Sequence, residues 1–167
     1  MLKKIALLVV LFALPLGAMA QKFAHMNSQE VIVVMPEYTK AQADLEAMSK
    51  KYSQEMERTQ SEFNKKVQEF QQQADSLPRN IAERRQKELQ EMAQRQEEFQ
   101  QEAYQSMQKA QQDALAPIYK KLDDAIQAVG KAEGAIYIFD LARTPMPYVG
   151  AESVDVTSKV KTQLGIK

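Results

Sequence analysis

A regular apolar stripe through the middle of the sequence constrains the fold more than any other feature. Between residues 37 and 77 it advances in steps of three, four and four residues, and only Thr59 within it is polar. An 11-residue repeat corresponds to about 3.67 residues per turn, so the stripe stays on one nearly straight face of a helix. Lys, Glu and Gln fill the other positions, which predicts one long helix with one narrow apolar face. The stripe consists of Leu45, Met48, Tyr52, Met56, Thr59, Phe63, Val67, Phe70 and Ala74.

A second stripe occupies residues 78–129 and predicts a second long helix. It is less regular, because Arg85 and Gln96 fall where apolar residues would fit. Pro117 lies inside this segment and is expected to kink the helix near its base. The apolar positions are Ile81, Leu89, Met92, Phe99, Ala103, Met107, Ala110, Ala114, Ile118, Leu122, Ile126 and Val129.

The sequence DSLP, residues 75–78, separates the two stripes and holds the only proline between Glu37 and Ala116. Proline disrupts a helix interior but costs almost nothing in the first turn of a new helix. One narrow stripe can satisfy one partner, and the nearest partner of each helix is the other one, folded back. We therefore predict an antiparallel hairpin with its tip near residues 75–80, in which Asp75 and Ser76 cap the second helix.

Both ends of the chain carry strand patterns. Residues 22–26 predict a strand, residues 30–35 a short helix or second strand, and Pro36 the first turn of the long helix. After residue 130, GAIYIFD predicts a strand, LARTPMP a loop and YVG a short strand. VDVTSKVKTQL predicts a closing helix with Asp155 or Thr157 as its N-cap. The fold class is therefore α+β, and the terminal strands can pair only if the hairpin brings its two bases together.

The first twenty residues are typical of a secretory signal peptide. Lys3 and Lys4 precede an apolar run, and small residues lead to an A-x-A site at Ala18–Ala20. Cleavage before Gln21 leaves 20 basic and 22 acidic residues, a net charge of 20 − 22 = −2. The remaining chain has no cysteine and no nucleic-acid-binding charge excess, so we expect a soluble periplasmic protein without a nucleic-acid partner.

The sequence offers no catalytic or metal-binding pattern. His25 is the only histidine and has no cysteine or second histidine with which to share a metal ion. Neighbouring acids such as Glu97 and Glu98 lie in predicted helices and are typical of solvated faces. No nucleophile set and no glycine-rich phosphate loop occurs. We expect no enzyme activity, no cofactor and no metal site.

Basic residues gather near the predicted tip, where they could attract acidic segments or anionic headgroups. Ordinary helix solubility explains the same cluster nearly as well, and both interpretations stay open. Tyr104 lies just off the second stripe and is a further contact candidate. The candidate binding residues are Arg79, Arg84, Arg85, Lys87, Lys65, Lys66 and Tyr104.

Three segments resemble the Skp/OmpH family of periplasmic chaperones in sequence and in order. They are HMNSQEVIVVMPEYTKAQADLE, AIYIFD and VDVTSKVKTQL, and the long Gln/Glu/Lys hairpin lies between the first two. The resemblance implies a homotrimer in which strands from both chain ends, residues 21–36 and 130–167, build a small β-barrel body. Residues 37–129 would form a protruding arm. The residues expected to be buried by trimerisation are Phe23, Ile32, Val34, Ile136, Ile138 and Phe139.

The resemblance also implies a function. Three arms would surround a cavity that holds unfolded outer-membrane proteins without ATP and prevents their aggregation. Anionic lipid or lipopolysaccharide headgroups are further candidate ligands. The alternative is a structural or adaptor coiled-coil protein of the cell envelope, which should carry a second apolar stripe for a fixed partner; the count of apolar residues finds one stripe per helix.

Overall fold

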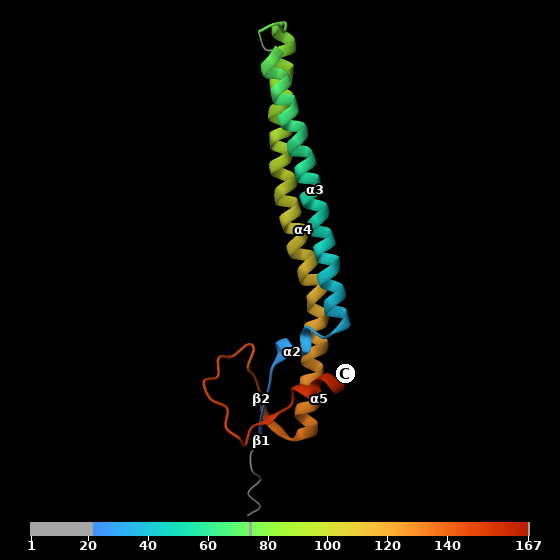
Figure 1. Cartoon of the computed structure of the whole chain (residues 1–167), viewed down its shortest axis with the longest axis vertical. Coiled ribbons are helices and arrows are strands. Elements are labelled where there is room, and N and C mark those ends of the chain that lie inside the picture. The colour runs from blue at the N-terminus through green and yellow to red at the C-terminus, as the bar shows by residue number, and fades with distance from the viewer. Residues whose placement is uncertain (1–21, 74, 167) are drawn as a thin grey trace, which may run out of the picture.

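The computed structural model describes residues 22–73 and 75–166, and the predicted signal peptide, residues 1–20, lies outside them. The chain forms a long two-helix arm that stands on a small base (Figure 1). In the arm, α3 (Pro36–Gln73) and α4 (Arg79–Glu133) lie side by side and run antiparallel. The predicted hairpin is therefore confirmed. In the described chain, no helix combines the length and apolar content that crossing a bilayer requires.

The tip of the hairpin is capped differently from the prediction. Pro78 occupies the N-cap position of α4 with φ −55° and ψ 142°, and no side chain caps this end. The expected capping of α4 by Asp75 or Ser76 is therefore wrong. Ser76 Oγ instead donates a hydrogen bond to the carbonyl oxygen of Gln73 at 2.9 Å, at the end of α3. The proline fixes the backbone just before the first helical residue, so the helix begins without a side-chain cap from Asp75 or Ser76.

A thin seam joins the two helices of the arm. The predicted stripe residues of α3 from Leu45 to Phe70 are all half-buried, and so are Arg85 and Gln96 on α4. Tyr52 and Phe99 contact across the seam with ring centroids 5.9 Å apart. Between residues 45 and 114, Ala103 is the only buried residue in the part that the structure describes. One apolar row per helix leaves the arm without a core of its own.

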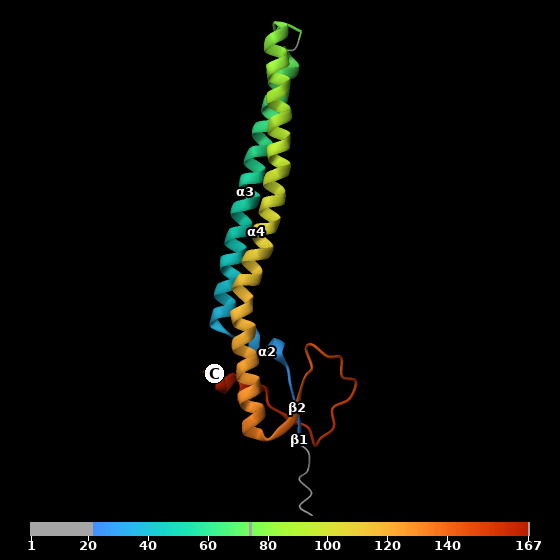
Figure 2. The ribbon, with the colours of Figure 1, turned by 180° about the vertical axis from the view of Figure 1, so that it is seen from behind.

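The compact core lies at the base, where both chain ends meet α4. Met26, Met35, Leu122, Val156 and Val160 are fully buried there. The segment that predicted either a short helix or a strand is a helix, α2 (Ser28–Ile32). The Asn27 side chain caps this helix by accepting hydrogen bonds from the backbone amides of Gln29 and Glu30, as an N-cap residue does. α5 (Thr157–Gln163) crosses the lower part of α4 (Figure 2).

The base also contains a three-stranded parallel sheet in the order β2-β1-β3. Its strands are β1 (Lys22–Met26), β2 (Ala135–Asp140) and β3 (Val154–Asp155). The central strand is thus the first in sequence, and its neighbours come from the other chain end. The expected pairing of the two ends is confirmed. Ile136 is skipped by the register between β1 and β2 and forms a bulge.

Two details of the C-terminal segment differ from the prediction. Residues 148–150 do not form a strand and belong to a loop, residues 141–153, that swings out from the base (Figure 1). The strand that pairs with β1 forms later, at β3. The N-cap position of α5 is Val156, so neither predicted residue occupies it. Asp155 lies one residue earlier, and its Oδ1 accepts hydrogen bonds from Thr157 N at 2.8 Å and Thr157 Oγ1 at 2.6 Å.

Candidate functional site

One face of the sheet exposes a row of aromatic side chains. Successive side chains of a strand point to opposite faces, so Ala24 and Met26 are buried while Phe23 lies on the outer face. Phe23 is 40% exposed and stacks on Tyr137, with centroids 6.4 Å apart and planes 7° apart. Tyr137 in turn contacts Phe139 at 6.0 Å. An exposed apolar row of this kind is typical of an interaction surface.

The six residues predicted for the trimer body divide into two groups. Ile32 is buried in the core of this chain, and Ile138 packs against the same core. The remaining four, Phe23, Val34, Ile136 and Phe139, are exposed. Sequence reasoning did not single out Tyr137 or the 80%-exposed Tyr148. The alternation in AIYIFD could have placed Tyr137 on the face of Phe139, whereas Tyr148 lies in a loop and follows no period.

A pocket of about 320 Å³ lies between this aromatic face and the loop of residues 141–153. Phe23 and Phe139 line it from the sheet, and Met146 and Tyr148 line it from the loop. His25 Nδ1 and Ser153 Oγ are 2.8 Å apart and join the sheet to the end of the loop. The loop therefore covers part of the aromatic face within the chain.

Two of the four basic residues near the tip lie close to acids of their own helix. Arg79 Nε lies 2.9 Å from Glu83 Oε1, and the amine of Lys87 lies 3.9 Å from Glu91 Oε1. Arg84 is exposed. Arg85 is half-buried in the seam. Lower on the arm, the amine of Lys65 lies 4.0 Å from Glu69 Oε1 of its own helix, α3.

Two ion pairs tie α3 to α4, one toward the tip and one at the base. Lys66 Nζ donates to Glu88 Oε1 at 3.0 Å, and this hydrogen bond lowers the pKa of Glu88 below its ordinary value. At the base, Lys121 Nζ donates to Glu37 Oε1, which likewise lowers the pKa of Glu37. Lys66 was predicted as a binding residue, and the structure places it as a link between the helices.

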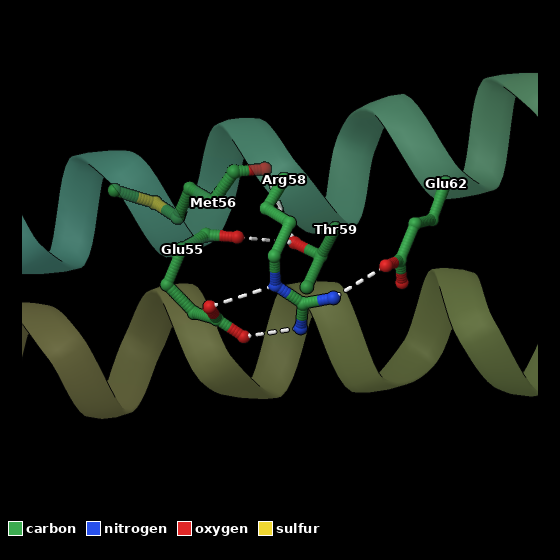
Figure 3. Close-up of polar contacts among 5 residues, drawn as sticks. All are labelled: Glu55, Met56, Arg58, Thr59 and Glu62. Carbon is green, nitrogen blue, oxygen red and sulfur yellow. Dashed lines mark hydrogen bonds and ion pairs between the residues drawn. The ribbon is translucent and has the colours of Figure 1, made fainter.

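A polar network occupies the middle of α3 (Figure 3). The guanidinium of Arg58 donates to both carboxylate oxygens of Glu55, at 3.0 and 2.6 Å, and also to Glu62. The hydrogen bond from Arg58 lowers the pKa of Glu55. Thr59, the polar member of the stripe, donates its hydroxyl to the carbonyl oxygens of Glu55 and Met56 at 3.0 and 3.1 Å. The threonine thereby satisfies its own hydroxyl in the seam.

An apolar groove of about 440 Å³ lies between the helices at the base of the arm. Small side chains, Ala41, Ala110 and Ala114, line it beside Leu45 and Met48. The charged pair of Glu37 and Lys121 borders it. Across residues 22–73 and 75–166 there is no group of three or more His, Cys, Asp or Glu side chains that could hold a metal ion. The described residues thus present three kinds of surface: an exposed aromatic sheet face, a long arm and shallow grooves.

A comparison with protein-family models matches residues 22–164 to the family described as outer membrane protein (OmpH-like). The match covers most of the chain, from β1 through α5. The chain belongs to this OmpH-like family. The predicted resemblance is therefore confirmed. No curated protein matches the sequence significantly.

A solved structure shares the OmpH-like fold. It is the crystal structure, at 2.83 Å resolution, of an OmpH-like protein from Caulobacter crescentus CB15 that is proposed to be an outer membrane chaperone. The TM-score is 0.74 over 89% of this chain and 86% of the other, with 16% sequence identity. At that identity the likeness establishes the fold, an arm on a small base.

Proposed function

We propose that this OmpH-like protein is an ATP-independent periplasmic holdase that encloses unfolded outer-membrane proteins and prevents their aggregation. The observation that carries the proposal is the arm, because it has length without a core. α3 has 38 residues and therefore extends about 57 Å, while its apolar side chains are only half-buried. Such an arm offers a long surface to an extended chain and no closed pocket to a small substrate.

The base supports assembly into a trimer. The aromatic row of Phe23, Tyr137 and Phe139 is exposed in the single chain, and β2 has a neighbour on one side only. A sheet with an open edge and an exposed aromatic face is a liability unless another chain covers it. Three copies that pair their sheets would close a barrel and set three arms around one cavity.

The proposed holding step involves no covalent chemistry. Unfolded β-barrel proteins expose strands that aggregate through unpaired edges, and separating them within a cavity blocks that route. The predicted signal peptide supplies the periplasmic location. The basic tip residues, and above all the exposed Arg84, would attract acidic clients or anionic headgroups at a distance.

Light scattering tests this function. An unfolded outer-membrane porin is diluted out of urea with and without the purified protein, in the absence of nucleotide. We expect suppressed aggregation at about three copies of the protein per porin. An envelope adaptor would leave the scattering unchanged while binding one folded partner, and that result would refute the holdase.

A further inference from the structure

One segment of α4 is almost free of charge. Residues 79–102 contain eleven Asp, Glu, Lys and Arg residues, whereas residues 103–119 contain only Lys109 and Asp113. These two pair with each other, with Lys109 Nζ 3.1 Å from Asp113 Oδ2. Charged residues keep a solvated helix soluble, so a stretch of 17 residues with only two of them marks a surface of a different kind.

Within this segment α4 carries another row of side chains, beside the apolar stripe that forms the seam. It consists of Tyr104, Gln108, Gln111, Leu115 and Tyr119, spaced four, three, four and four residues apart, and we call it the Tyr–Gln stripe. This spacing keeps the five side chains on one helical face. Tyr104 is 65% exposed and Tyr119 is 41% exposed. The seam residues Ala103 and Ile118, next to them in sequence, are buried, whereas four of the five stripe residues are exposed. Leu115 is half-buried and packs against the core at the base.

The stripe is shaped and ordered by contacts of its own. Gln108 Nε2 donates to the Tyr104 hydroxyl at 2.8 Å. At the other end, the guanidinium of Arg143 lies over the Tyr119 ring, 5.7 Å from its centroid. Between them lies a shallow depression of about 510 Å³, lined by Gln108, Gln111, Gln112, Leu115, Ala116 and Tyr119.

We propose that the Tyr–Gln stripe docks the transmembrane-strand segments of the unfolded client, an inference that rests on the proposed holdase function. Such segments alternate apolar lipid-facing residues, where charge is disfavoured, with polar lumen-facing ones. A surface poor in charge matches the apolar side of these segments, because a highly charged segment would lose hydration there and gain little opposite charge. Glutamine amides can both donate to and accept from an exposed main chain, and tyrosine supplies rigid contact area at low entropic cost.

The length of the stripe fits this occupant. Fifteen residues separate its two tyrosines, which corresponds to about 22 Å along a helix. A strand covers about 3.3 Å per residue, so roughly seven residues of an extended segment would span the stripe. Transmembrane strands have about 9 to 11 residues, so one stripe holds most of one strand.

Charge substitution at the centre of the stripe tests the proposal. We expect both Gln111→Glu and Gln111→Lys to weaken the affinity for an unfolded porin at least fivefold, because either charge must be desolvated. Glu and Lys preserve the helix, and the positions four residues away, Met107 and Leu115, offer no new ion pair. The control is the same pair of substitutions at exposed Gln42, which lies on α3 and outside the stripe, and which should leave the affinity unchanged.

A photo-crosslinker placed at position 108, with position 42 on α3 as control, identifies the occupant. We expect position 108 to capture the porin in higher yield and to crosslink mainly to its transmembrane strands. The docking role of the stripe would be overturned if both Gln111 variants bound the porin as tightly as the unchanged protein. Crosslinks mainly to charged loops would overturn it as well. In either case the proposed holdase function would stand if the protein still suppressed porin aggregation. Opposite effects of Glu and Lys would reveal charge attraction and would also overturn it. Absence of any porin binding by the unchanged protein refutes both proposals.

Discussion

Replacing Phe99 by alanine should loosen the arm without disturbing the base. Phe99 lies in the seam, half-buried, with its ring 5.9 Å from that of Tyr52. Truncating a phenylalanine in a full core costs about 3–5 kcal/mol. Because this side chain is only partly buried, in a seam with one apolar row per helix, we expect a cost below that range, about 2 kcal/mol, including the lost contact between the aromatic rings.

Hydrogen exchange measures this effect locally. A loss of about 2 kcal/mol in the free energy of local opening corresponds to roughly 30-fold faster exchange, at 1.4 kcal/mol per tenfold. The acceleration should appear in the amides of α3 and α4 around the seam and be absent from the base, whose core lies around Leu122 and Met26. Tyr104→Ala is the matched control, because it removes an exposed ring five residues away on the same helix.

Two results would contradict this role of Phe99 in the seam. If Phe99→Ala leaves exchange in the arm unchanged, the ring does not hold the helices together and the half-buried stripe is not the seam. Equal acceleration by Tyr104→Ala would show that any aromatic truncation loosens α4, which also contradicts the account.

Three further predictions concern backbone, pH and charge. Gly134 ends α4 at φ 64°, so Gly134→Ala should cost about 1 kcal/mol and lower the melting temperature by about 2–4 °C in calorimetry, even though no atom crowds the added methyl. The pKa of Glu88 is lowered in the folded state by Lys66, so its stabilisation is present at neutral pH and is lost as the pH falls below the ordinary value of 4.5. Glu88→Gln should therefore flatten part of the decline in urea midpoint between pH 5 and pH 3. Replacing the four basic tip residues with Gln should slow capture of an acidic unfolded client in low-salt stopped-flow experiments and leave dissociation unchanged, and equal capture rates would exclude the attraction. Those four residues are Arg79, Arg84, Arg85 and Lys87.

The hairpin could be predicted from the sequence because its stabilising pattern is local. A repeat of 11 residues fixes which side chains share a face, and one break at Pro78 fixes where the chain turns. The spacing held even where the second stripe has polar residues, since Arg85 and Gln96 are half-buried like their apolar neighbours. The spacing of the apolar residues and the position of this proline were thus enough to predict both helices and their antiparallel pairing.

The details that sequence could not supply depend on tertiary contacts. YVG has the composition of a strand, but a strand needs a neighbour, and β1 has its free edge filled by Val154 and Asp155 instead. The caps of α4 and α5 were misplaced because proline and valine occupy the N-cap positions and provide no side-chain acceptor. Local sequence preference sets a helix end or a short strand only where no tertiary contact overrides it.

The Tyr–Gln stripe was missed for a different reason. Counting apolar residues finds one stripe per helix, because two of the five stripe positions are glutamine. The scarcity of charge in residues 103–119 was visible in the sequence and could have indicated the stripe. The exposure of Tyr104 and Tyr119 needed the structure, since only the packing of α3 shows which face of α4 is left open.

Native mass spectrometry of the protein mixed with an unfolded porin tests the central claim most directly. We expect a complex of three copies of this chain with one porin, because in the proposed trimer three arms surround the client and the aromatic sheet faces join the three bases. The same stoichiometry should form without nucleotide. A porin bound to a single copy, or a protein that stays monomeric and binds no porin, would contradict the account.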